Sequence, residues 1–549
     1  MQVIGLSESL SIEFKSDQKR LTDSEIIEAV VAFANTQGGD LYLGVEDDGT
    51  ITGLHVAHQN PTQLTALIAN RTIPPVPVRC ELIDTTPPVL KITVPSRPSI
   101  VATSTGKIIQ RRIKSDGRPE NIPMYPYEII SHLSDLRLLD YSAQPLPGAT
   151  VDDFSPLERE RLRTALRTFG GEHHLLELSD EELDGALQLT TLVQGVRTPT
   201  VAGLLILGKA ERLKALMPTA ESSIQILKGT TIAVNESFTL PLLAAVEKIN
   251  ATIKAYNSSE EFEMGLFRVD VPTIDERAFR EALVNAYSHR DYSMLGRVRV
   301  QLNDEGLTIS NPGGFTDGIT LHNLLDAEPH GRNPTLADAL KRIGLAERSG
   351  RGIDRIYEGS LIYGRMLPDY SESTAHLVRV YIPNTPADKA FMTMVFNEQK
   401  ERGRSLSVST LLLLYLIKRL HRPTLNNLLD CSGFSETKVH QILDSLLEKG
   451  LIHRVGSGKN QSYVLSSGRY PDGVREASVR YNVRPNKAKQ QELVVDLIKS
   501  QGYVTRGDVS EHLGMSLPQA YHLLKAMAEK NTITLLHSGR YARYVLADG

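Results

Sequence analysis

Apolar and polar residues alternate in two segments near the start of the chain. Ile12 and Phe14 alternate with Glu13 and Lys15, which is the spacing of a strand with one buried face and one solvated face. A helical stretch follows, and residues 40–47 predict a second strand. Strands and a helix in this order predict an α/β domain at the start of the chain.

A helical period of apolar residues marks the middle of the chain. Phe279, Leu283 and Ala286 recur at helical spacing and form one apolar stripe. Glu281 and Asn285 lie one turn apart and share another face of the same helix. A carboxylate and an amide oxygen held together can bind Mg²⁺ and a water molecule, so this helix is a candidate chemical site.

Strands and glycine turns follow this helix. Residues 297–302 and 306–310 predict a strand pair, and the second strand runs into Asn311-Pro-Gly-Gly314. Another glycine-rich segment, Ser349-Gly-Arg-Gly-Ile-Asp354, opens a helix, where backbone amides can approach an anion. Upstream, the apolar run Val201–Leu207 predicts a buried strand.

The end of the chain contains an internal repeat. The first copy, residues 409–465, predicts three helices followed by a strand pair, and the second copy, residues 491–546, repeats this order. Ser435 and Ser516 are the predicted N-caps of the third helices. The glycines in the turns before these helices are Gly433 and Gly514.

Composition indicates a globular protein of several domains. The chain has 549 residues, of which 41% are hydrophobic and 23% charged. This length predicts about three or four domains. The longest aliphatic run, Leu411–Ile417, is too short to cross a bilayer, and Met1-Gln-Val-Ile-Gly lacks the features of a secretory signal. With only Cys80 and Cys431 and no disulfide framework, we expect a cytoplasmic protein without a membrane partner.

Charge is distributed unevenly along the chain. Residues 401–549 contain 21 Lys and Arg against 13 Asp and Glu, whereas the whole chain has a formal net charge of −4. The tail is therefore basic and the preceding body is acidic. A basic tail on an acidic body fits contact with a nucleic-acid backbone, although a solvated surface would have the same composition.

Three acids and a lysine in the first fifty residues form a candidate catalytic site. Glu8 and Glu13 point in different directions on either a helix or a strand, so the chain must turn between them for both to serve one ion. With Asp47 and Lys15 they would suit phosphodiester cleavage dependent on Mg²⁺ or Mn²⁺. The alternative is that Glu13 and Lys15 form a solvated strand face and that Asp47 belongs to a hairpin turn.

These residues carry a resemblance to a known family. Glu8-Ser-Leu-Ser-Ile-Glu-Phe-Lys15 and Phe33-Ala-Asn-Thr-Gln-Gly-Gly39 resemble the first two motifs of the Schlafen AlbA-type domain. The resemblance implies nucleic-acid binding or cleavage, with Glu8, Glu13 and Asp47 holding the divalent cation and Lys15 on a phosphate. A basic segment closing this domain could hold phosphate or form a solvated edge. Its candidate contacts are Arg111, Arg112 and Lys114.

The ordered motifs in the middle of the chain resemble the histidine-kinase-like, or GHKL, ATPase fold. This resemblance implies that ATP or a related nucleotide binds, with Asn285 as a ligand of its Mg²⁺ and Glu281 polarising water. The implied phosphate loop and first glycine box contain Gly350, Gly352, Asn311, Gly313 and Gly314. Hydrolysing members read adenine with an Asp near the place of Asn311, so a fold that only holds domains together is the alternative.

Both repeats in the tail resemble winged helix-turn-helix domains. In that fold the third helix enters the major groove and the hairpin wing contacts the adjacent backbone. The implied contacts on the third helices are Lys438, His440, Gln441, Gln519, His522 and Lys525. Those on the wings are Arg454, Lys459, Arg540 and Arg543. The alternative is that one or both modules pack against protein.

These features together predict an α/β (α+β) multidomain protein. The predicted domains are a Schlafen-like head at 1–144, a connector at 150–260, a GHKL-like α/β sandwich at 261–384, and tandem winged helices at 401–468 and 486–549. One hypothesis is a metal-dependent endonuclease on RNA or DNA, gated by the middle domain and serving anti-phage or stress defence. The other is a non-catalytic, ATP-responsive transcription regulator. A homo-oligomer is expected for either.

Overall fold

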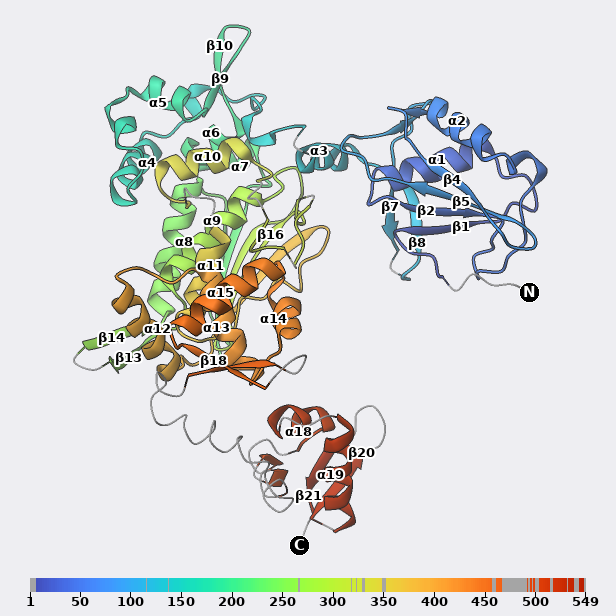
Figure 1. Ribbon diagram of the computed structural model, residues 1–549. Coiled ribbons are helices and arrows are strands. Elements are labelled where there is room, and N and C mark those ends of the chain that lie inside the picture. Colours follow the sequence, from blue (N-terminus) through green and yellow to red (C-terminus); the bar gives the residue numbers. More distant parts are fainter. Residues whose placement is uncertain are drawn as a thin grey trace. The chain divides into compact units, whose positions relative to one another are not determined.

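The structure is a computed structural model of a mixed α/β chain, which confirms the predicted fold class (Figure 1). It describes residues 6–456 except 115, 137, 265–266, 317, 322, 328–330 and 348–351, and then 461–466, 491, 494–495, 497–498, 503–513, 517–530, 532–537 and 543–547. The chain divides into two compact units. The first comprises Met1–Ser258, Pro272–Ile356 and Pro368–Asn384, and the second comprises Ser259–Val271, Tyr357–Leu367 and Thr385–Gly549. No helix in the described ranges is long and apolar enough to cross a membrane.

A four-stranded sheet and two helices form the first domain. Its elements are β1 (Ile12–Lys15), α1 (Asp23–Ala34), β2 (Gly39–Leu43), α2 (Pro61–Arg71), β4 (Arg79–Ile83) and β5 (Val89–Val94). The strand order is β1-β2-β5-β4, with β1 and β2 parallel and the other pairs antiparallel. Both predicted strands are present, although β2 ends at Leu43. Apolar residues of α1, α2 and the sheet form the core.

Short strands and one helix complete this domain. They are η1 (Val56–His58), β3 (Thr72–Ile73), β6 (Ala102–Thr103), β7 (Ile109–Ile113), β8 (Pro119–Pro123) and α3 (Pro126–Asp135). Asn35, directly after α1, donates from Nδ2 to the carbonyls of Val101 at 2.7 Å and Ile109 at 2.9 Å, and its Oδ1 accepts from the Val101 N–H. Because these backbone groups are buried, the asparagine of the Phe-Ala-Asn-Thr motif satisfies them and fixes β7 beside α1.

The connector follows, and it corrects one prediction. Its elements are η2 (Tyr141–Ala143), η3 (Val151–Asp153), α4 (Pro156–Thr168), η4 (His173–Glu177), α5 (Asp180–Ala186), β9 (Thr190–Val193), β10 (Val196–Pro199), α6 (Val201–Leu207) and α7 (Ala210–Leu216). The predicted strand at Val201–Leu207 is wrong, because these seven buried residues form helix α6. Thr200 caps it by accepting from the Gly203 N–H at 3.0 Å. An apolar run buried on every side has no period that distinguishes a short helix from a strand.

A five-stranded sheet organises the middle of the chain. Its elements are β11 (Ser222–Lys228), β12 (Thr231–Phe238), α8 (Leu242–Tyr256), α9 (Glu276–His289), β15 (Val298–Asn303), β16 (Gly306–Pro312), α10 (Pro334–Ile343), α11 (Gly352–Leu361) and β17 (Leu377–Pro383). The order is β12-β11-β15-β16-β17, and only β11 and β15 are parallel. The predicted pair β15 and β16 is confirmed. Helix α9 packs on β16.

The second unit contains the tail repeat. Its elements are β13 (Ser259–Met264), β14 (Phe267–Pro272), α12 (Lys389–Arg402), α13 (Val408–Leu420), α14 (Leu425–Ser432), α15 (Glu436–Glu448), β18 (Ile452–Val455), β19 (Ser462–Leu465), α18 (Arg506–Leu513), α19 (Leu517–Glu529), β20 (Ile533–His537) and β21 (Arg543–Leu546). The first copy has the predicted order of three helices and an antiparallel strand pair. Ser435 caps α15, and Gly433 after α14 has φ +69°. Gly514 and Ser516 lie outside the described residues.

Candidate functional site

The predicted acidic site in the first domain is centred on a buried ion pair. Glu13 of β1 and Arg111 of β7 are 3% and 5% exposed, and Arg111 Nη1 lies 2.5 Å from Glu13 Oε2. Asn121 Nδ2 donates to both carboxylate oxygens at 3.1 Å, and Lys15 Nζ lies 2.9 Å from Oε1. Glu13 therefore belongs to an internal network, and the alternative of a solvated strand face is wrong for this residue.

Arg111 is held by further backbone contacts. Its Nε donates to the Ser9 carbonyl and its Nη2 to the Ile12 carbonyl, both at 2.9 Å. The guanidinium also lies over the Phe33 ring, 4.8 Å from its centroid. Burial lowers the pKa of Arg111, whereas the charges of Glu13 and Glu8 act in the opposite direction. This arginine was a predicted phosphate contact, but its side chain faces the protein interior.

The other two predicted metal ligands lie in different environments. Glu8 Oε1 accepts from the Phe14 N–H at 3.0 Å, which closes the turn that the spacing of Glu8 and Glu13 requires. Asp47 is exposed in the turn after β2. Its neighbour Glu46 points inward and accepts from Ser16 Oγ and Thr52 Oγ1, both at 2.7 Å.

The structure does not assemble these acids as a metal site. Within the described part of the chain, no group of three or more His, Cys, Asp or Glu side chains is placed to hold an ion. Sequence reasoning missed Asn121, which faces Arg111 across the β7–β8 pair. Only the register of that pair could have identified Asn121, because its distance in sequence from Glu13 gives no signal.

Two of the predicted basic contacts are exposed, one in β7 and one directly after it. Arg112 donates from Nε to Glu120 Oε1 at 2.8 Å, and Lys114 Nζ lies 3.7 Å from Glu120 Oε2. Their side chains are 52% and 45% exposed. Of the three predicted contacts on this segment, these two can reach a ligand in solvent.

In the middle domain the predicted pair and one predicted glycine meet. A Cβ added to Gly352, the first residue of α11, would lie 2.1 Å from Glu281 Oε1 and 3.3 Å from Asn285 Nδ2. Glycine therefore lets the start of α11 approach the polar face of α9. Burial raises the pKa of the Glu281 carboxyl, and a backbone hydrogen bond from Glu347 partly offsets this. A carboxylate with a raised pKa is suited to accept a proton from water.

The first glycine box is closely packed. A Cβ on Gly313, which has φ +95°, would lie 1.8 Å from Arg332 Nη1, and one on Gly314 would lie 2.5 Å from the Ala375 carbonyl. Arg332 is 3% exposed and its Nε lies 2.8 Å from Asp135 Oδ1 of α3. Asn311 is buried on β16 and donates to the Pro312 carbonyl at 3.2 Å. Gly350 lies outside the described residues.

The predicted contacts on the first tail repeat are mostly on its surface. His440 and Gln441 of α15 are exposed, and Lys438 is half-buried, with Nζ 3.9 Å from the Phe434 centroid. Arg454 of β18 is exposed and lies 2.9 Å from Asp444 of α15. Lys459 lies outside the described residues.

The second repeat is described less completely. His522 and Lys525 of α19 are exposed, and so is Arg543 of β21, whose guanidinium lies 4.3 Å from the Tyr503 centroid. Lys525 Nζ lies 3.9 Å from Glu529 within the same helix. Arg540 and the side chain of Gln519 lie outside the described residues.

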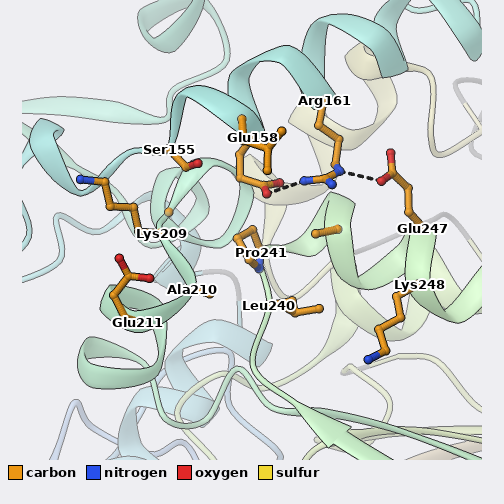
Figure 2. Close-up of a pocket in the computed structure, with 13 residues that line it drawn as sticks. Ser155, Glu158, Arg161, Lys209, Ala210, Glu211, Leu240, Pro241, Glu247 and Lys248 are labelled. Atoms are coloured by element: carbon orange, nitrogen blue, oxygen red, sulfur yellow. Dashed lines mark hydrogen bonds and ion pairs between the residues drawn. The ribbon is translucent and has the colours of Figure 1, made fainter.

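A cavity of about 770 Å³ in the connector was not predicted (Figure 2). Glu158 and Arg161 of α4 and Glu247 of α8 line it, and Arg161 pairs with both carboxylates, with Nε 2.6 Å from Glu247 Oε2. Lys209 and Lys248 lie on its other walls. The lining comes from segments that are far apart in sequence, so no spacing in the chain points to it.

Comparisons with known proteins agree with two of the three resemblances, those of the first domain and of the middle domain. A family model described as Schlafen, AlbA_2 matches residues 8–119. One described as "Putative ATP-dependent DNA helicase recG C-terminal" matches residues 296–382, and a domain of unknown function, DUF8451, matches residues 133–223. The crystal structure of the DIP2311 protein from Corynebacterium diphtheriae has a similar fold, with a TM-score of 0.50 and 20% identity over 98% of this chain and 95% of that chain.

The chain is therefore a multidomain protein that joins a Schlafen-type domain to an ATPase-like domain. Specifically, it carries a Schlafen AlbA-type domain at residues 8–119 and a recG-type ATPase-like domain at residues 296–382. The first domain supports nucleic-acid binding as the general function, and the second supports nucleotide binding.

Proposed function

We propose that this protein is a non-catalytic, nucleotide-responsive nucleic-acid-binding regulator. The observation that carries the proposal is the environment of Glu13. Its carboxylate oxygens are occupied by Arg111, Asn121 and Lys15 in a buried network. A divalent cation would have to displace two positive groups from this carboxylate and then sit beside them, which is unfavourable in a poorly solvated place.

The positions of the other acids support the same conclusion. Glu8 is bound to the backbone N–H of Phe14, and Asp47 is exposed in its turn. Mg²⁺ prefers several oxygen ligands in near-ideal octahedral geometry. The three acids that the sequence assigned to one metal ion are therefore better explained as structural residues of a domain that binds nucleic acid through basic side chains at its surface.

The middle domain provides the nucleotide response in this proposal. Gly352 lets the start of α11 lie directly against Glu281 and Asn285, where a Cβ would lie 2.1 Å from Glu281 Oε1. A carboxylate and an amide beside a helix start have the chemistry that suits a nucleotide and its Mg²⁺. Asn285 would supply an amide oxygen to the ion, and Glu281 would orient or deprotonate water. A bound nucleotide would supply the charge that holds the start of α11 in place. Binding without fast turnover is expected, because Asn311 replaces the adenine-reading acid.

The test is a combined binding and cleavage assay on the full chain. End-labelled tRNA, single-stranded DNA and duplex DNA are incubated with Mg²⁺ or Mn²⁺, and binding is measured at several salt concentrations. We expect salt-dependent binding with no cleavage. Metal-dependent cutting that Glu8→Ala and Glu13→Gln each abolish, and that Asp47→Asn also reduces, would instead establish the endonuclease hypothesis and open the question of a role in defence.

The nucleotide response is tested separately from cleavage. Nucleic-acid affinity of the full chain is measured with and without ATP and Mg²⁺, beside the Asn285→Ala variant. We expect ATP and Mg²⁺ to change the nucleic-acid affinity of the wild type but not that of Asn285→Ala. Equal nucleic-acid affinity in all conditions would show that nucleotide binding and nucleic-acid binding are not coupled.

A further inference from the structure

Two tyrosines at the end of the first domain are stacked on each other in solvent. The rings of Tyr125 and Tyr127 are 6.1 Å apart between centroids, with an angle of 8° between their planes. Tyr125 is 54% exposed and Tyr127 is 45% exposed. Aromatic rings contribute most to a fold when they are buried, so a parallel pair left in water serves the core poorly.

The backbone holds this pair in place. Pro126 lies between the tyrosines at the first position of α3, and Tyr125 is extended, with φ −74° and ψ 157°. The Tyr125 N–H donates to Glu128 Oε2 at 2.7 Å, which fixes the start of the helix. A tyrosine has few rotatable bonds, and the proline restricts the chain between the two rings. The pair is therefore pre-organised, and little conformational freedom would be lost when a ligand covers it.

One basic side chain, Arg112, lies within electrostatic reach of both rings. The pKa of Arg112 is raised chiefly by its hydrogen bond to Glu120, with smaller effects from Tyr125 and Glu128. Arg112 lies in β7 and Lys114 directly follows that strand, and both side chains lie beside Glu120, with Arg112 Nε at 2.8 Å and Lys114 Nζ at 3.7 Å from its carboxylate oxygens. Glu120 holds Arg112 through Nε, but a guanidinium has further N–H donors. Glu120 and Glu128 are acidic groups that act on Arg112 at this surface.

We propose that Tyr125 and Tyr127 form a stacking platform for unpaired bases and that Arg112 and Lys114 contact the adjoining phosphates, so that the first domain binds single-stranded nucleic acid. This rests on the proposed nucleic-acid-binding function and names its substrate class. Exposed aromatic rings beside basic groups bind single strands without sequence preference, because every base has a flat face. In a duplex those faces are already covered by neighbouring bases.

The experiment measures Kd by fluorescence anisotropy with the full chain at one fixed salt concentration. The probes are a labelled single-stranded DNA, the same sequence as RNA, and the matching DNA duplex. The variants are Tyr125→Ala with Tyr127→Ala, and Tyr125→Phe with Tyr127→Phe as the matched control. Because both rings are exposed, all variants should unfold at the wild-type temperature, which circular dichroism checks.

The alanine pair should weaken single-strand binding by about 5- to 100-fold and leave duplex binding within about twofold. The phenylalanine pair should bind as the wild type does, since it keeps both flat faces. Equal losses for single strand and duplex, or no loss, would overturn the platform while leaving the proposed function intact. If the wild type binds no probe at all, the proposed function fails as well. Comparing the Kd values for the DNA and RNA single strands shows which of the two the platform binds more tightly.

Discussion

Arg111 of β7 and Glu13 of β1 form a buried ion pair although 98 positions separate them in the chain. The pair exists because Asn35 holds β7 beside α1 while β1 pairs with β2 in the same domain. It also changes the role that each residue can have. An acid predicted to hold a metal and a base predicted to hold a phosphate neutralise each other inside the protein.

Arg111→Ala should destabilise the first domain. Removing the guanidinium leaves the buried Glu13 with fewer positive partners, and loss of one partner of a buried pair costs about 3–5 kcal/mol. Urea unfolding of the full chain, followed by tyrosine fluorescence, should show an earlier first transition. Arg112→Ala, on the same strand but exposed, is the control and should leave that transition in place. Unchanged unfolding of both variants would contradict the structural role of Arg111.

The same pair can be tested by replacing both members. Arg111→Met with Glu13→Leu should recover much of the stability lost by Arg111→Ala, because an apolar pair of similar volume leaves no buried charge behind. A double variant as unstable as the single one would mean that the hydrogen bonds of Arg111 to Ser9 and Ile12, rather than its charge, dominate.

Gly352→Ala should disturb the middle domain and its nucleotide binding together. The added Cβ would lie 2.1 Å from Glu281 Oε1, so Glu281 must move, and overpacking of this kind costs about 1–3 kcal/mol. Thermal unfolding and titration with a fluorescent ATP analogue measure the two effects. Gly185→Ala in α5 is the control, since its Cβ would meet nothing within 4 Å. Normal analogue binding by Gly352→Ala would argue against a site at this position.

Stability of the first unit should fall in mild acid because of His289. Removal from water, together with the positive charges of Arg332 and Lys341, lowers the pKa of His289 from 6.5 to about 4. Below pH 6.5 the unfolded chain takes up a proton that the folded chain does not, so stability is lost as pH falls from about 6.5 towards about 4. His289→Gln should flatten the pH dependence of the unfolding temperature across this range. The exposed His174→Gln should leave it as steep as in the wild type.

Lys438→Ala should weaken duplex DNA binding if α15 contacts the backbone. One lost phosphate contact should lower affinity uniformly across sequences and reduce the slope of log K against log salt by about 1. Arg419→Ala, an exposed cation at the end of α13, is the matched control. Identical salt slopes for the wild type, Lys438→Ala and Arg419→Ala would favour the alternative in which this repeat packs against protein.

Local signals predicted much of the fold correctly. Ser435 caps α15 because a serine hydroxyl satisfies a free helical N–H, and Gly433 takes a positive φ that other residues avoid. The β15–β16 pair follows from alternation alone. The prediction of a strand at Val201–Leu207 was wrong, because a short apolar run has no polar face that would reveal its period.

The candidate sites were predictable only in part. Glu281 and Asn285 share a face because helix geometry fixes residues one turn apart, and Gly352 was expected near them only through a family resemblance. The closure of the Gly313–Gly314 turn by Arg332, and the ion pair of Arg332 with Asp135, had no sequence signal. Contacts between distant segments depend on how the elements pack, which local spacing does not encode.

The sequence by itself determined most of the element types, though not that of Val201–Leu207, and it determined the repeat in the tail, the uneven charge and the family motifs, because each depends on neighbouring residues. Tertiary structure alone decided which charged side chains are left in water. Packing buries both Glu13 and Arg111, although Arg111 directly precedes the exposed Arg112, whereas Tyr125 and Tyr127 remain accessible. The chemistry available to a ligand follows from that burial, because a charge paired inside the protein is no longer free to bind anything else.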